Sequence, residues 1–281
     1  MWRISVYDMW KVLYTGFPQT LVFGKTRGVK MEITLMNVEW TYFFLISLAC
    51  FAIAILFSQK LGLNELRTIP RLEVLEEVVK SCSERGRPIL FSYGGMNPAS
   101  TMESVLLASA NVLMMRTAKT CGDLGIPLYT TALHAQTFLM MTDSVRQGYL
   151  ASSHPEAFRD ENNYYTTDGI VGTYTNVSQA VQHNVGTYVQ IGYLHMCSNV
   201  CVLEAVRRIG GTSWTMENAI DTQALGLVFA DYTLLGEEQV AAGAMIKKDP
   251  LETAGIIGGD FAKLALIGLL IIYIVRQGLK I

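Results

Sequence analysis

The sequence predicts an α/β protein in which a Rossmann-like, three-layer sandwich with a parallel sheet of about five strands is flanked by two transmembrane helices. The first observation is that short apolar runs alternate with helical patterns between residues 69 and 250. Such alternation is typical of a parallel sheet with helices on both faces. The second observation is a long apolar stretch on each side of this region, at 40–58 and 258–277. We therefore expect one α/β domain that is attached to a lipid bilayer.

The stretch 40–58 contains no charged residue and has the length of a membrane span. A helix of this length is about 28 Å long, close to the roughly 30 Å hydrocarbon core of a bilayer. Trp40 and Tyr42 stand at one end, where aromatic rings favour the membrane interface. The alternative is a helix in the buried core of a large protein, but such helices rarely lack polar residues over this length. We expect a transmembrane helix.

Segments of different character surround the predicted α/β domain. Residues 1–39 form a predicted N-terminal contact segment, in which aromatic residues stand among charges. A terminal segment without a core of its own is ordered when a partner or a second copy holds it. Residues 59–68 are a linker, and residues 69–250 form the Rossmann-like domain.

The first half of the α/β domain begins with a helix that Pro70 opens in its first turn and Gly86 ends. Residues 88–93 then read as a buried strand, after which Gly94 and Gly95 turn the chain. The next expected elements are a helix from 101 to about 121, a strand at 126–133 and a helix at 136–151.

The second half continues the same alternation. The expected elements are a helix at 168–183, a strand at 187–194, a helix at 198–209, a short strand from 212 to 215, a helix at 217–227, a strand at 230–235 and a helix at 237–246. Right-handed crossovers between parallel strands turn this alternation into a three-layer sandwich. The order of the strands within the sheet cannot be read from the sequence.

The second apolar stretch is uninterrupted only over residues 264–275, which alone is too short to span a bilayer. Extended to 258–277, it becomes long enough. Lys263 can pair with Asp260 or reach the headgroups, and Arg276 can reach them at the far end. The alternative is a helix that packs on the α/β domain or lies at the membrane interface.

Composition and charge limit the classes of function. Charged residues make up 16% of the chain, the net charge is −2, and the mean hydropathy is +0.29. The low charge content indicates an integral membrane protein, and the near-neutral balance gives no sign of a nucleic-acid surface. Charges beside the two spans are balanced and do not set the orientation. The five cysteines form no dense disulfide framework, which favours a cytoplasmic α/β domain.

Four groups of residues resemble a known family. They are Phe91-Ser92-Tyr93-Gly94-Gly95 before a helix that carries threonine, Gly192-Tyr193-Leu194 before Glu204, Gly210-Gly211-Thr212, and the run from Asp231 to Glu238. On these motifs the chain resembles an uncharacterised family of archaeal and bacterial membrane proteins, the domain of unknown function 6754. The likeness covers residues 69–275, about three quarters of the chain. It implies a Rossmann-like domain beside membrane helices and no known activity.

The candidate ligand site lies at the carboxyl ends of the strands, where ligands bind in such folds. Gly94 and Gly95, followed by Ser100 and Thr101, could hold a phosphate on backbone N–H groups at a helix N-terminus. The alternative is a tight turn that only needs glycine, because the full dinucleotide fingerprint is absent. The ligand-binding residues predicted for this edge are Gly94, Gly95, Asn97, Ser100, Thr101, His134, His195, Thr212 and Glu237.

No residue is assigned a catalytic role. His134 and His195 each follow a strand and could act as acid and base, or could cap helices or bond to the backbone. His195 with Cys197 and Cys201 does not match zinc spacings, so no metal is expected. Glu237 suits the start of a helix for structural reasons alone. No phosphate loop or nucleophile elbow is complete, and no cofactor is expected.

Three functions remain open. The first hypothesis is a non-enzymatic, membrane-anchored subunit or scaffold that assembles into a homo-oligomer or a larger membrane complex. The alternative is a sensor or enzyme that binds a nucleotide or another small molecule around Gly94 and Gly95. Transport is weaker, because two spans supply few polar groups to line a path.

Overall fold

The computed structural model describes residues 69–194, 196–217 and 219–278, together with residues 45, 48, 49, 52, 53 and 56. The chain divides into two compact units, 1–45 and 46–281, and the α/β domain lies wholly in the second. The predicted contact segment 1–39 and linker 59–68 lie outside the described residues, as does most of the stretch 40–58.

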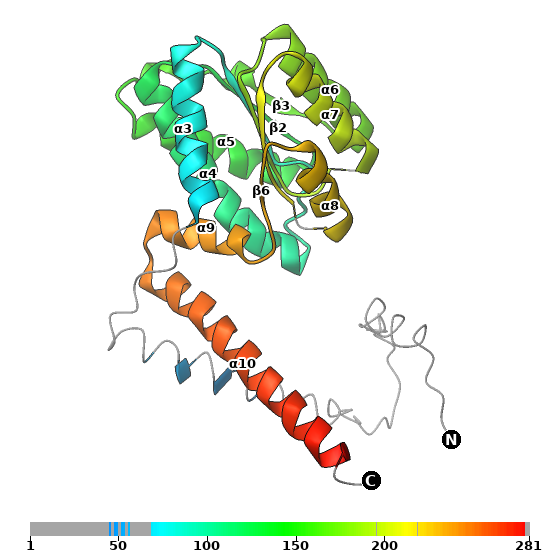
Figure 1. The fold of residues 1–281 in the computed structure, drawn as a ribbon. Helices are drawn as coiled ribbons and strands as arrows, with labels where there is room; N and C mark the ends of the chain where they lie inside the picture. Colours follow the sequence, from blue (N-terminus) through cyan, green and yellow to red (C-terminus); the bar gives the residue numbers. More distant parts are fainter. Residues whose placement is uncertain are drawn as a thin grey trace, which may run out of the picture. The chain divides into compact units, whose positions relative to one another are not determined.

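The predicted Rossmann-like parallel sheet is confirmed, with six strands instead of about five (Figure 1). The strands are β1 (Ile89–Ser92), β2 (Leu128–Ala132), β3 (Asn163–Tyr165), β4 (Thr187–Ile191), β5 (Thr212–Met216) and β6 (Tyr232–Leu234). Their order is β3-β2-β1-β4-β5-β6, and all pairs are parallel. The sequence did not predict β3, because this edge strand is too short and too polar to give a recognisable pattern.

Helices cover both faces of the sheet (Figure 1). One face carries α3 (Pro70–Glu84), α4 (Thr101–Leu124) and α5 (Ala135–Leu150), with α9 (Glu238–Lys247) packed against α4. The other face carries α6 (Gly169–Gln182), α7 (Met196–Arg208) and α8 (Ile220–Phe229). The last helix is α10 (Pro250–Gly278), and two 3-10 turns, Pro155–Ala157 and Asp160–Asn162, precede β3.

The core has two parts, one on each face, because alternate side chains of a strand point to opposite sides. Phe91 and Trp214 are buried against the α3–α5 side. Leu90 and Tyr188 are buried against the α6–α7 side, in the same cluster as Val202 of α7. Strands that are buried on both faces read as nearly continuous apolar runs, which is why the sequence located most of them.

Local sequence sets several helix ends as expected. Pro70 occupies the first turn of α3. The Asp168 carboxylate caps α6 by accepting hydrogen bonds from the N–H groups of Ile170 and Val171, at 2.7 and 3.4 Å. Gly125 ends α4 in the left-handed conformation with φ of +68°, which glycine adopts at little cost.

The transmembrane helices predicted at 40–58 and 258–277 are not confirmed. Among the helices of the described residues, none is both long and apolar enough to cross a membrane. α10 begins at Pro250, earlier than the predicted span, so it also includes Glu252. The expected ion pair between Asp260 and Lys263 is present, with 3.0 Å between the carboxylate oxygen and Nζ.

Candidate functional site

The two strands at the centre of the sheet, β1 and β4, define the place where a ligand would be expected. The strand order reverses between them, since β1 pairs with β2 on one side and with β4 on the other. In doubly wound sheets, ligands bind at the carboxyl edge at this reversal point. The loop that contains Gly94 and Gly95 follows β1 and therefore lies at this edge, as predicted.

The loops after β1 and β4 contact each other directly, and this contact fills the place at the carboxyl edge where a ligand would be expected. Gly94 has φ of +50°, and a Cβ added there would lie 2.6 Å from the Tyr193 carbonyl oxygen. Gly192 has φ of +89°, and a Cβ there would overlap Met96 Cγ. Met96 itself is fully buried. These glycines are therefore required by backbone conformation and close packing, which is the structural alternative that the sequence left open.

Every N–H group of the loop 94–100 already has an acceptor within the protein. Gly95 N–H donates to the Tyr193 carbonyl at 2.5 Å, and Asn97 N–H donates to the Glu103 carboxylate at 2.7 Å. The other donors, from Gly94, Met96, Ala99 and Ser100, bond to acceptors of residues 92, 93 and 97. A phosphate would need these donors, so its binding would require the loop to rearrange and Glu103 to move.

The other residues predicted for this edge are scattered. Ser100 precedes α4 without a side-chain capping bond, and the side chain of Thr101 lies outside what the structure describes. His134 is exposed at the start of α5, whereas His195 is outside the described residues. Glu237 precedes α9 and forms an ion pair with Lys263 of α10.

Thr212 lies at the opposite edge of the sheet from the glycine loop. It begins β5, pairs in register with Thr187 at the start of β4, and its N–H donates to the Gly186 carbonyl at 2.9 Å. The strand that it begins continues through Met216. The residue of this segment that reaches the carboxyl edge is therefore Glu217.

A row of buried polar side chains crosses the sheet beneath α6, α7 and α8. The strand register aligns Thr131, Ser92, Gln190, Thr215 and Thr233 on neighbouring strands, and all are at most 5% exposed. Their side chains bond to other groups of the protein, such as Thr131 Oγ1 to Asn176 Oδ1 of α6 at 2.7 Å and Thr215 Oγ1 to Thr233 Oγ1 at 3.1 Å. A layer of buried polar side chains is stable when its donors and acceptors are hydrogen-bonded within the protein, as they are here.

Glu217 extends this polar layer to the carboxyl edge of β5 and is fully buried. Its carboxylate accepts a hydrogen bond from Asn199 Nδ2 of α7. Its backbone carbonyl accepts from Gln223 Nε2 of α8, at 2.8 Å, and from Gln239 Nε2 of α9. Glu217 thus joins the end of one strand to three helices.

Burial raises the pKa of the Glu217 carboxyl to about 7, because a low-dielectric environment disfavours the charged form. The nearby Thr222 hydroxyl, which donates to the Ala219 carbonyl at 2.9 Å, and the hydrogen bond from Asn199 act in the opposite direction, and the charge of Asp221 adds to the rise. A carboxyl group that titrates near neutral pH is a common property of functional sites. Glu217 is therefore a buried carboxyl group that titrates near neutral pH at the carboxyl edge of the sheet.

Sequence reasoning missed Glu217 because it assigned residues 217–227 to a helix, where an acidic first turn is ordinary. The helix α8 begins only at Ile220. The usable signal was the rule that located His134, namely a polar residue directly after a buried strand.

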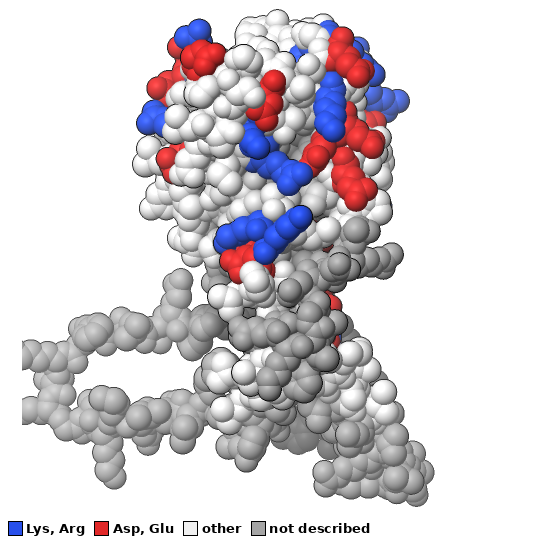
Figure 2. All heavy atoms as spheres, turned by 90° about the vertical axis from the view of Figure 1, so that its left-hand side faces the viewer, with Lys and Arg blue, Asp and Glu red and all other residues white. Residues whose placement is uncertain are grey.

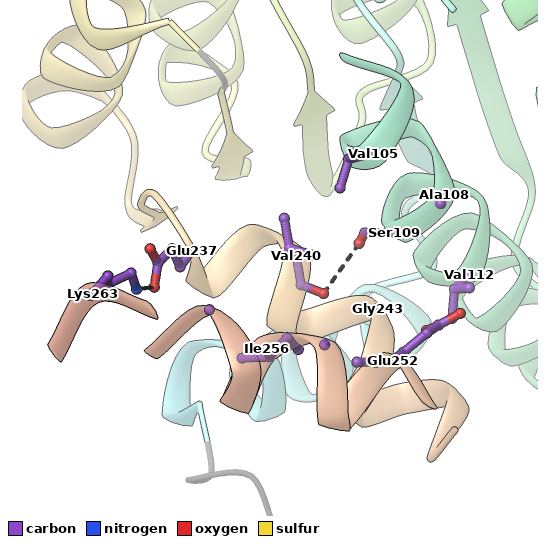
Figure 3. A pocket seen from close by; sticks show the side chains of 13 residues that line it. Val105, Ala108, Ser109, Val112, Glu237, Val240, Gly243, Glu252, Ile256 and Lys263 are labelled. Atoms are coloured by element: carbon purple, nitrogen blue, oxygen red, sulfur yellow. Dashed lines mark hydrogen bonds and ion pairs between the residues drawn. The ribbon is translucent and has the colours of Figure 1, made fainter. Parts of the chain in front are cut away.

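A cavity of about 470 Å³ lies between α4, α9 and α10 (Figure 3). Its walls are mainly small and apolar side chains, among them Val105, Val240 and Ile256. The Glu237–Lys263 ion pair lies at its border. The cavity suits an apolar occupant, because the polar groups that line it already have partners: Ser109 bonds to the Val240 carbonyl, Glu237 pairs with Lys263, and Glu252 pairs with Lys247.

The described residues give no indication of a metal centre, since no three of their His, Cys, Asp and Glu side chains cluster in a way that could hold an ion. Cys201 of α7 is a free, exposed cysteine. Glu204 on the same helix forms an ion pair with Arg208, one helical turn away, at 2.9 Å.

Residues 29–281 match the family model described as Domain of unknown function (DUF6754). No curated protein matches the chain.

Proposed function

The chain belongs to the DUF6754 family, whose activity is unknown, and from its structure we propose that it is a membrane-anchored α/β scaffold that assembles with copies of itself. The bilayer is the proposed environment of α10 and of the stretch 40–58, with the α/β domain on the cytoplasmic side. A small-molecule function at Gly94 and Gly95 has less support, because the N–H donors of that loop are occupied.

The observation that carries the anchoring proposal is the exposed surface of α10. The large apolar side chains described beyond Asp260 are between 41% and 64% exposed, namely Phe261, Leu264, Leu266, Ile267, Leu270 and Ile271. At 100° per residue these positions cover more than half of the helix circumference. Full burial of one such side chain stabilises by roughly 1.5–3 kcal/mol, so lipid suits this surface much better than water.

The cavity between α4, α9 and α10 supports the same placement. It lies where α10 leaves the α/β domain, and its apolar walls continue into the exposed apolar surface of the helix. Gly255 and Gly259 face open space on α10, with no atom within 4 Å of an added Cβ. Acyl chains or an apolar helix can therefore approach the α10 backbone closely at this point.

The assembly proposal rests on α6. This helix contains no charged residue, although Ile170, Val171 and Tyr174 are between 52% and 71% exposed. A groove of about 270 Å³ is lined by residues of α6 and of the neighbouring α7. A charge-free face fits a second copy of itself, because no like charges meet when the same surface is used twice.

Anchoring is tested by asking whether lipid surrounds α10. We expect the protein to stay with membranes after an alkaline carbonate wash, and an Ile267→Trp variant to be quenched by lipids with brominated acyl chains. The matched control is Leu139→Trp on α5, where the native side chain is 68% exposed, and its added fluorescence should not be quenched. Release of the protein by carbonate, or equal quenching of both variants, would contradict the proposal.

A further inference from the structure

Five buried side-chain oxygen atoms in the described part of the protein lack a hydrogen-bond partner, and two of them belong to one pair of bonded residues. These two are Glu217 Oε2 and Asn199 Oδ1, and both residues are fully buried. The second polar atom of each side chain is already hydrogen-bonded, because Asn199 Nδ2 donates to Glu217 Oε1. Buried polar atoms are nearly always paired, so two unpaired acceptors on bonded partners call for a missing donor.

We propose that Glu217 is a proton-binding site: in the folded protein it carries a proton on Oε2 and donates it to Asn199 Oδ1. A carboxylic acid and a carboxamide are planar forks of the same size, each with one donor and one acceptor. The pair then closes with two parallel hydrogen bonds, Nδ2–H to Oε1 and Oε2–H to Oδ1. A single proton, taken from water, satisfies both unpaired oxygens.

The groups around Glu217 act in both directions. The Thr222 hydroxyl of α8 and the hydrogen bond from Asn199 of α7 favour the carboxylate, whereas burial and the Asp221 charge favour the protonated form and outweigh them. α8 contributes the Asp221 charge, which disfavours a second negative charge. β4 contributes the neutral phenol of Tyr188, whose pKa is raised by burial and by the Glu217 charge. α7 and α9 contribute the neutral amides of Asn199 and Gln239. Exchanging the positions of nitrogen and oxygen in the Asn199 amide would not remove the need for a proton. Asn199 Oδ1 would then face Glu217 Oε1, and two acceptor oxygens would meet with no donor between them.

Bound in this way, the proton stabilises the contact between Glu217 and Asn199 at the carboxyl edge of β5. Its loss would leave a buried charge and place two acceptor oxygens against each other, which is unfavourable without a donor. Because the Glu217 carbonyl also accepts from Gln223 of α8 and Gln239 of α9, we expect the ends of these helices to loosen when the site ionises. The device is independent of the proposed scaffold function.

Infrared spectroscopy of the full-length protein tests the proton directly. We expect a protonated-carboxyl band at about pH 6 that fades by about pH 8, following the pKa near 7, and that is absent in Glu217→Gln. The matched control is Glu204→Gln, which alters an exposed carboxyl on α7 and should keep the band. No such band at about pH 6, or a band that persists in Glu217→Gln, would overturn the proposal.

Stability measured against pH gives a second readout. The folded pKa near 7 exceeds the ordinary value of 4.5, so between these pH values the folded chain binds more protons than the unfolded chain. The free energy of unfolding should therefore fall as the pH rises through that range and level off above it. Glu217→Gln should remove this component of the pH dependence, because its amide replaces the carboxyl hydroxyl as donor.

Asn199→Asp provides a check should Glu217→Gln fail to fold. Two carboxyls that share one proton hold it more tightly than an acid and an amide do. The band should therefore persist at about pH 8 in this variant. A band that fades at the same pH as in the parent protein would show that the proton is not shared with position 199.

Discussion

At the scale of single residues, the carboxyl edge of the sheet combines positions with opposite requirements. Gly94 has a left-handed backbone and lies against the Tyr193 carbonyl, so any side chain there meets backbone atoms. Glu217 instead places a carboxyl group in a fully buried position, where only hydrogen bonds and protonation make it tolerable. The space around Gly94 restricts which residue fits there, whereas at Glu217 the constraint is the cost of burying a charge.

The requirement at Gly94 is tested by comparing two alanine variants. Gly86→Ala has a left-handed φ of +62° but open space around the new Cβ, so we expect it to cost roughly 1–2 kcal/mol of stability. Gly94→Ala adds a contact with the Tyr193 carbonyl and should cost at least about 1 kcal/mol more. Urea denaturation of both variants measures the difference. Equal losses would mean that the two loops are not in tight contact.

At the scale of elements, α6 shows how one helix can be specified locally and still serve a surface. Asp168 fixes its start by bonding the N–H groups of Ile170 and Val171. Its inner face is small and polar, with Asn176 bonded to Thr131 and Ser92 of the sheet. Its outer face is apolar and free of charge, which is unusual for a helix that only meets water.

The cap of α6 predicts a pair of variants with different stabilities. Asp168→Ala removes the acceptor for two N–H groups and should cost about 1 kcal/mol. Asp168→Asn keeps a side-chain oxygen at the same place and should retain most of the stability. Thermal unfolding followed by circular dichroism distinguishes them. If the asparagine variant lost as much stability as the alanine variant, the capping bond would not be what stabilises this end of the helix.

At the scale of the whole molecule, the surfaces differ in what they suit. Figure 2 shows charges of both signs over the side that carries α3, which is typical of a surface in contact with water. The α6 face has no charge, and the far part of α10 exposes apolar side chains around much of its circumference. A protein with three such surfaces suits three environments: water, a second copy and lipid.

The α6 face predicts a change in oligomeric state. In detergent, the protein should run as an oligomer by size exclusion with light scattering, and Tyr174→Lys should shift it towards the monomer because a buried unpaired charge opposes association. Leu150→Lys on α5 is the matched control, since its native side chain is also highly exposed, at 66% against 71% for Tyr174. A monomeric parent protein, or dissociation by the control alone, would refute this interface.

Much of the fold could be predicted from the sequence, because strands that are buried on both faces consist of recognisable runs of apolar residues. The apolar runs at β1, β2 and β4 and the helical spacing of α3 predicted the alternation, and glycine and proline marked several ends. The edge strand β3 contains no such run, since its polar residues are only partly covered. Glu217 was assigned to a helix because a carboxylate after a strand and a carboxylate in a first helical turn look alike in sequence.

The sequence by itself determined the parallel α/β class, the positions of most elements and the place of the glycine turn after β1, because these depend on neighbours along the chain. Only the tertiary structure decided the strand order, the filling of the expected ligand site by Tyr193 and Met96, and the meeting of Glu217 with Asn199. The physical reason is that hydrogen bonding and desolvation act between groups that folding brings together. Residues distant in the sequence decide whether a carboxyl such as that of Glu217 is exposed to water or buried beside an amide.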